Sequence, residues 1–203
     1  MAKVKMYLDP IGNTLNIWWG DPKSAYESYE VDDPNRNDVI IKDKGLCPRF
    51  NAIVVDNVKI KPSPAFIKNR LEASGIRAIN NIVDISNYIM LELGQPIHAF
   101  DYDKIKGAKM VLRETTEGER IKTLDGQTRK LPKGTIVIED AERLIDLCGI
   151  MGGENSGIDL NTKKAILFAQ IYDPVHIRKT SMALTLRTEA AQRFEKGLDP
   201  EMV

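Results

Sequence analysis

Three short segments, each predicted to form a loop, contain residue types that could take part in a reaction. The segment Gly94–Asp101 carries His98, one of only two histidines in the chain. A second segment holds the glycine pair Gly152 and Gly153, and a third holds Thr188. A histidine can donate or accept a proton near neutral pH, and adjacent glycines let a ligand approach the backbone closely. With a threonine hydroxyl beside them, these groups suit a ligand that carries an ester.

Each of these residues also has an ordinary structural explanation. His98 could be satisfied by a backbone carbonyl, the glycine pair could form a tight turn, and Thr188 could cap the last helix. The glycine segment lacks the Gly-Lys-Ser/Thr ending of a P-loop, so it predicts no nucleoside triphosphate site. No arrangement of Ser, His and Asp predicts covalent catalysis. Residue types alone leave both interpretations open.

The composition is that of an ordinary globular protein. Of the 203 residues, 42% are hydrophobic and 29% are charged, and the formal net charge is zero. A neutral chain has no field that attracts nucleic acid non-specifically. We therefore expect no DNA binding, and only local contacts with any RNA.

The two cysteines, Cys47 and Cys148, stand far apart and outside any metal-ligand spacing. The sequence therefore predicts no metal site and no cofactor. The cysteines also form no disulfide framework, which is typical of a reducing compartment. There is no signal-like start and no apolar run of about 18 residues, so we expect a cytoplasmic protein without a membrane partner.

The first 45 residues differ in pattern from the rest. Short β-type runs at Val4–Leu8 and Thr14–Trp19 flank turn residues, which predicts a hairpin. The polar, proline-containing stretch over 32–38 is typical of a linker. We predict a hairpin segment and linker over 1–45 and a main domain over 46–203.

Four helices are predicted in the main domain. Ser63 is the expected N-cap of the first helix, and Asn81 that of the second, which ends at Gly94. The last two helices are expected to follow Asp173 and Thr188.

Strands are predicted between these helices. Asn51–Ile60 is a β-rich run, Asp125–Gly126 predicts a two-residue hairpin turn, and the nearly all-apolar Ala165–Tyr172 predicts a strand buried on both faces. The predicted fold class is α+β: a mostly antiparallel sheet with flanking helices, preceded by a small N-terminal hairpin.

Five motifs follow one another along the chain: Asn-Asn-Ile-Val-Asp at 80–84, Gln-Pro-Ile-His-Ala-Phe-Asp at 95–101, Thr-Leu-Asp-Gly at 123–126, Gly-Ile-Met-Gly-Gly-Glu-Asn-Ser at 149–156 and Leu-Arg-Thr-Glu-Ala at 186–190. Together they resemble the B-three/B-four editing module of the beta subunit of bacterial phenylalanyl-tRNA synthetase. The resemblance runs from about Cys47 to Pro200.

The resemblance implies a module that binds the acylated 3′ end of the tRNA for phenylalanine. There it would hydrolyse the ester when tyrosine has been attached by mistake. At the motif positions, it implies that His98 and Thr188 are catalytic and that Gly152 and Ala190 bind the substrate. An aminoacyl ester is already activated, so a positioned water and stabilisation of the oxyanion suffice without a covalent nucleophile.

One position departs from the family's pattern. The family carries a glutamate that recognises the tyrosine hydroxyl, and a count without gaps from Gly152 places Phe168 there. Phenylalanine cannot accept that hydrogen bond, so we expect Phe168 to change the specificity of the substrate pocket. Gln170 is the candidate replacement, because residues two apart share a strand face. Thr185 stands where the family usually has glycine.

Three functions are therefore compatible with the sequence. The chain could be an editing hydrolase, a non-catalytic module that binds tRNA or a synthetase subunit, or a free-standing aminoacyl-tRNA deacylase with altered specificity. No aminoacylation motif is legible, so we do not expect the chain alone to ligate phenylalanine to tRNA. The expected partner is the 3′ aminoacyl end of tRNA, with a synthetase alpha subunit as a further candidate.

Overall fold

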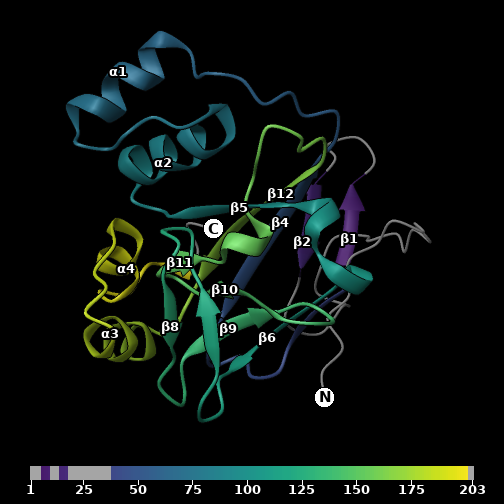
Figure 1. Cartoon of the computed structure of the whole chain (residues 1–203), viewed down its shortest axis with the longest axis vertical. Coiled ribbons are helices and arrows are strands. Elements are labelled where there is room, and N and C mark those ends of the chain that lie inside the picture. Colours follow the sequence, from purple (N-terminus) through teal and green to yellow (C-terminus); the bar gives the residue numbers. More distant parts are fainter. Residues whose placement is uncertain (1–5, 10–13, 18–37, 201–203) are drawn as a thin grey trace.

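A computed structural model of the chain describes residues 6–9, 14–17 and 38–200 (Figure 1). Two five-stranded sheets form its centre. The first sheet has the strand order β1-β2-β4-β12-β5, and every neighbouring pair in it is antiparallel. Its strands are β1 Met6–Asp9, β2 Thr14–Ile17, β4 Arg49–Val55, β12 Ala165–Ile171 and β5 Ile97–Asp101.

The second sheet has the strand order β11-β10-β9-β6-β3. Only the β3–β6 pair in it is parallel. Its strands are β11 Met151–Gly152, β10 Leu144–Leu147, β9 Ile136–Glu139, β6 Lys109–Glu114 and β3 Asp38–Ile41.

A two-stranded hairpin of β7 Arg120–Lys122 and β8 Thr128–Lys130 completes the β structure. The prediction of a two-residue turn at Asp125–Gly126 is wrong. Thr123 N donates to Gln127 O (3.0 Å) and Gly126 N donates to Thr123 O (2.8 Å), so three residues form the loop. Gly126 takes the left-handed conformation (φ 77°) that such a loop requires at its last position.

The first two helices, α1 Ala65–Ala73 and α2 Asn81–Leu93, lie together at one end of the molecule (Figure 1). Both predicted caps are wrong. The Ser63 hydroxyl donates to Asp84 (2.6 Å) instead of capping α1. The α2 cap is Asn80, whose side-chain oxygen accepts from the amides of Ile82 and Val83, because its backbone is extended.

The last two helices, α3 Pro174–Ala183 and α4 Glu189–Phe194, lie side by side near β11 (Figure 1). Both predicted caps are confirmed: Asp173 accepts from His176 N, and Thr188 accepts from Ala191 N. Between the two helices, Thr185 has a positive φ of 49°. A β-branched residue is strained there, which explains why glycine suits this position.

The hydrophobic core lies between the two sheets. One cluster of buried side chains contains members of both, and three phenylalanines form its aromatic centre on the first sheet. The Phe168 ring lies 4.9 Å from that of Phe50 and 5.2 Å from that of Phe100. On the second sheet the cluster includes Leu112 and Ile138. Apolar surface removed from water by this packing is the main stabilising contribution.

The α+β prediction with mainly antiparallel pairing is confirmed, although the strands are divided between two sheets. The N-terminal hairpin is present as β1 and β2, and it extends the first sheet because β2 pairs with β4. The strand β3 was not predicted, and it pairs with β6. The boundary between 45 and 46 stays a prediction. Within the described residues, 3₁₀ turns occupy Tyr102–Lys104, Lys106–Ala108 and Glu154–Ser156.

Candidate functional site

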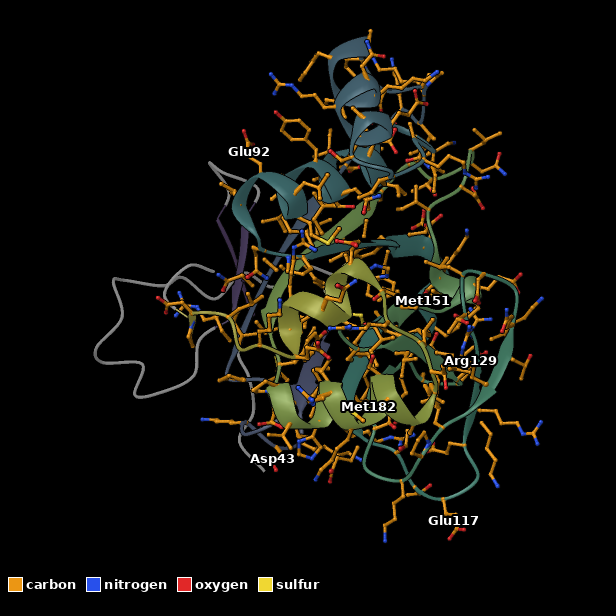
Figure 2. The ribbon with its side chains drawn as sticks, turned by 90° about the vertical axis from the view of Figure 1, so that its left-hand side faces the viewer. Asp43, Glu92, Glu117, Arg129, Met151 and Met182 are labelled. Atoms are coloured by element: carbon orange, nitrogen blue, oxygen red, sulfur yellow. The ribbon has the colours of Figure 1, made fainter. Side chains whose placement is uncertain are left out.

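A small cavity lies where the edge of the first sheet meets β11 and α4. Its volume is about 70 Å³, and residues from all three predicted segments line it. Figure 2 labels Met151, one of the lining residues, at about mid-height of the molecule, below Glu92 of α2 and above Met182 of α3. The lining residues with a bearing on chemistry are His98, Asp146, Gly152, Gln170, Tyr172 and Ala190.

His98 lies on the strand β5, whereas the sequence predicted a loop. Its strand partner is Phe168, and its ring packs edge-on against Phe100 with 4.5 Å between centroids. Nε2 of His98 is buried and has no hydrogen-bond partner among the described residues. Burial lowers the pKa of His98 to about 4, because the charged form loses its hydration. His98 is therefore neutral at pH 7 and can serve as a hydrogen-bonding group.

Gly152 leaves the space that the His98 ring occupies. A Cβ at this position would lie 2.5 Å from Cε1 and 2.6 Å from Nε2 of His98, closer than real Cβ contacts. The requirement for glycine is therefore steric, because a side chain at position 152 would displace the imidazole. The segments that carry His98 and Gly152 therefore lie next to each other in the fold.

The hairpin loop between β7 and β8 covers the glycine pair. Leu124 N donates to Gly152 O (3.0 Å), and Thr123 forms an isolated β-bridge with Gly153. Asp125 holds the loop in shape through its ion pair with Arg129 (2.6 Å), which lowers the pKa of the Asp125 carboxyl. The Thr-Leu-Asp-Gly motif thus positions the cavity wall and contributes no reactive group to it.

The Thr188 hydroxyl both donates and accepts a hydrogen bond within the fold. Its Oγ1 accepts from Ala191 N (3.1 Å) and donates to Ile150 O (2.8 Å). The hydroxyl proton is therefore already used. Thr188 ties α4 to the backbone just before Gly152, while Ala190, on the same helix, lines the cavity.

The two β12 residues predicted to bind the substrate lie in different surroundings. Gln170 lines the cavity; its backbone oxygen accepts from Gln95 Nε2 (2.9 Å), and its own Nε2 is buried without a partner among the described residues. Phe168 is fully buried in the aromatic core and is absent from the cavity wall. The roles of all six predicted residues remain proposals.

Asp146, the one carboxylate among the described residues that line this cavity, was not predicted from the sequence. It lies on β10, is 4% exposed, and faces the Cys148 thiol, which also approaches the Tyr172 hydroxyl. Burial raises the pKa of Asp146 to about 7 and raises those of Cys148 and Tyr172 as well. A single acidic residue in the apolar run Leu144–Ile150 was the available signal.

The other histidine, His176, is engaged away from this cavity: it contacts Asp173 (2.5 Å) and Glu114 (3.2 Å). No group of three or more potential metal ligands occurs within residues 38–200 and the two described strands before them. Over the same residues, no helix has the length and apolar character needed to cross a membrane.

A second cavity lies on the opposite face of β12, beneath α2. It is larger, about 320 Å³, and its wall is mostly apolar. Its lining includes Ile53 of β4, Ile89 of α2, and Leu167 and Ala169 of β12. The Ser86 hydroxyl at its edge already donates to Val83 O (2.7 Å). Apart from hydrophobic contact, this wall offers little to a reacting ester.

Comparison with known proteins connects the chain to one family. Residues 46–203 match the model of the B3/4 domain. Curated proteins named phenylalanine--tRNA ligase beta subunit are 47% identical over 163 residues in Protochlamydia amoebophila and 49% over 161 residues in Carboxydothermus hydrogenoformans. These alignments cover 80% and 79% of this chain but 20% of each relative, so the chain spans about a fifth of their length.

A solved structure shares the fold. It is an N-terminal fragment of the phenylalanyl-tRNA synthetase beta subunit from Pyrococcus horikoshii, with a TM-score of 0.52 and 15% identity. The match covers 77% of this chain and 50% of that one. Since the family model spans most of the sequence, the chain belongs to the B3/4 domain family.

Proposed function

We propose that this B3/4 domain hydrolyses the ester of a mischarged aminoacyl-tRNA, in the setting of a phenylalanine-tRNA ligase beta subunit. The observation that carries the proposal is the buried His98 Nε2, which has no partner among the described residues and lies against Gly152 at a small cavity. Leaving such a group unpaired costs about 1–3 kcal/mol, and a substrate atom or an attacking water could supply its partner.

The low pKa of His98 limits its role. A histidine with a pKa of about 4 is a weak base at pH 7, so we assign it the task of orienting a water or a terminal ribose hydroxyl. Water adds to the ester carbonyl, the ribose hydroxyl leaves with a proton, and the amino acid is released. Thr188 acts as a positioning residue, because its hydroxyl proton already goes to Ile150 O.

The proposed partner is the aminoacylated 3′ end of the tRNA for phenylalanine, in the cytoplasm. The beta-subunit names of the relatives support a further partner, a synthetase alpha subunit that would supply the aminoacylation site. The formal net charge of zero suits a module that receives its RNA through such a larger assembly.

The test is deacylation of tyrosyl-tRNA for phenylalanine by the purified chain, beside the phenylalanyl ester. We expect hydrolysis of the tyrosyl ester, and a loss of at least tenfold in the His98→Ala variant. Circular dichroism and thermal unfolding would establish that the variant is folded.

The opposite result has a clear meaning. If the folded wild-type chain hydrolyses neither ester, the hydrolase proposal fails. A binding measurement with the same tRNA would then decide whether the domain is a non-catalytic tRNA-binding module.

A further inference from the structure

Three polar side chains with unused hydrogen-bonding capacity border the small cavity. His98 Nε2 and Gln170 Nε2 are buried and have no partner within the described part of the chain. The third is Asp146, whose carboxyl group has the weakly donating Cys148 thiol as its side-chain partner. Buried polar groups in native folds are nearly always hydrogen-bonded, so a water or a ligand at this place would be held on several sides.

Strand register explains why the three lie together. Asp146 is directly opposite Gly152 in the β10–β11 pair, so the two Cβ positions share one face and are about 5 Å apart. A Cβ on Gly152 would lie 2.5 Å from Cε1 of His98, which places the His98 ring next to Asp146 on that face. On the first sheet, His98 pairs with Phe168, and Gln170 lies two residues further along the same face of β12.

The size of the cavity limits what these groups can bind. Its volume of about 70 Å³ holds about two water molecules. That is room for one water and the carbonyl oxygen of an ester, while the rest of the substrate stays outside. Met151 and Ala190 of the cavity wall are partly exposed, so an ester can approach from the surface.

A hydrolytic water needs a group that accepts its proton. His98, with a pKa of about 4, is a weak base at neutral pH. Burial raises the pKa values of Cys148, Tyr172 and Cys47, so these groups stay protonated. Asp146 is the remaining titratable group among the described residues that line the cavity, and its pKa of about 7 suits a base that works near neutral pH.

We propose that Asp146 is the catalytic base that takes a proton from the attacking water. The water oxygen bonds to the ester carbonyl carbon while one water proton passes to the Asp146 carboxylate. The bond between that carbon and the ribose oxygen then breaks, and Asp146 returns the proton to the ribose oxygen. The products are the free amino acid and the ribose hydroxyl, and the carboxylate is restored. This inference rests on the proposed hydrolysis and assigns its proton transfer to the second sheet.

His98 and Gln170 complete the binding of the water. The Gln170 N–H donates to the water oxygen, and Nε2 of His98, in the tautomer with its proton on Nδ1, accepts the second water proton. One lone pair of the water oxygen is then left for the ester carbonyl. This arrangement uses both unpartnered atoms and holds the water in one orientation.

The first experiment measures deacylation of tyrosyl-tRNA between about pH 5.5 and 8.5 by the full chain and by Asp146→Asn, with the uncatalysed rate subtracted. For the wild type, we expect kcat/KM to rise with pH through an inflection near 7, because only the ionised carboxylate accepts a proton. At the upper end of this range, Asp146→Asn should lower kcat by at least about 100-fold, leave KM within about twofold, and abolish the inflection. The variant should fold, since asparagine carries no charge to bury.

Asp43→Asn is the matched control, because it makes the same change at the edge of the molecule, away from Met151 (Figure 2). It should leave the rate and the pH profile unchanged. Asp146→Ala supplies a second test, since it opens space for a small carboxylate. Added formate should raise the deacylation rate of this variant by at least about tenfold and have no effect on the wild type. A purely structural role for Asp146 would give no such rescue.

The outcomes separate this inference from the proposed function. If the wild type deacylates and His98→Ala does not, but folded Asp146→Asn keeps the wild-type rate and inflection, the inference is wrong and the hydrolase proposal stands. If the wild type hydrolyses neither ester at any pH, both are wrong. A wild-type profile without an inflection near pH 7 overturns the inference without any variant.

Discussion

The two cavities on either side of β12 differ in what they offer a ligand. The larger, about 320 Å³, lies between the sheet and α2 and has a mostly apolar wall. The smaller, about 70 Å³, contains His98, Asp146 and Gln170. Adjacent residues on one strand belong to opposite sides: Ala169 lines the larger cavity and Gln170 the smaller.

The contrast shows that volume does not select the reactive site. Apolar walls provide contact, but ester hydrolysis needs groups that bind and orient a water and a developing charge. Two buried polar atoms at the small cavity, His98 Nε2 and Gln170 Nε2, have no partner among the described residues. We therefore assign the chemistry to the small cavity.

The largest expected effect is that of Gly152→Ala. The added Cβ would lie 2.5 Å from His98 Cε1, so the ring must move by an ångström or so. A displacement of this size costs on the order of 100-fold in rate. Deacylation assays should show this loss, while circular dichroism stays close to that of the wild type.

Gly45→Ala is the matched control for this substitution. No positive φ is required at Gly45, and its nearest neighbour is the flexible Asp43 side chain at 3.2 Å. Equal loss of activity in both variants would mean that general destabilisation, and not displacement of His98, is responsible.

Much of this arrangement could be predicted from the sequence. Asp173 and Thr188 were predicted correctly as caps. Each side chain accepts a hydrogen bond from an amide three residues later, so the capping interaction depends only on the local sequence. The same rule gave wrong predictions for Ser63 and Asn81, because their side chains bind residues distant in the sequence. The Ser63 hydroxyl donates to Asp84, and the Asn81 side-chain oxygen accepts from Lys61 N. Local pattern cannot reveal a competing tertiary contact.

The site was less predictable than the fold. His98, Gly152, Gln170 and Ala190 do line one cavity, but only the resemblance to a family grouped them in advance. Asp146 was missed because its meaning depends on register: it matters only since Gly152 lies opposite it. A shift of one residue in strand register moves every side chain to the other face, so the spacing of residues along the chain does not by itself show which side chains lie opposite each other.

Asp146 and His98 should have opposite effects on stability as the pH changes. The folded-state pKa of Asp146 is raised from 3.8 to about 7, so its stabilising contribution is full below pH 3.8 and is lost as the pH rises to 7. That of His98 is lowered from 6.5 to about 4, so its contribution is full above pH 6.5 and is lost as the pH falls to 4. The two slopes oppose each other between about pH 4 and 6.5.

Asp146→Asn removes the contribution of Asp146 to the pH dependence of the unfolding free energy. The unfolding free energy of the variant relative to the wild type should increase between pH 4 and 7, by at most about 1.4 kcal/mol per pH unit. Urea unfolding at several pH values measures this difference, in which the other carboxylates cancel. If the unfolding free energies of the two proteins have the same pH dependence, the pKa of Asp146 is not raised in the folded state.

Thr188→Ala should lower the unfolding free energy by about 1–2 kcal/mol, because it removes the cap of α4 and the bond to Ile150 O. Thr188→Ser keeps the hydroxyl and should restore both stability and deacylation. For a positioning residue, the rate at saturating substrate should fall in Thr188→Ala with the shape of the pH profile unchanged. A changed pH profile would instead indicate direct participation in proton transfer.

The smallest expected effect lies in the apolar cavity. Ala169 pairs with Asn51 and Ile97 on the face beneath α2, and valine there would add two methyl groups to unfilled apolar space. Ala169→Val should raise the unfolding free energy by about 1 kcal/mol and leave deacylation unchanged. Its neighbour Gln170 gives the contrast, since Gln170→Leu removes an N–H donor from the smaller cavity and should lower deacylation. If Ala169→Val also lowers deacylation, the larger cavity takes part in substrate binding, and the division of roles between the two faces of β12 is wrong.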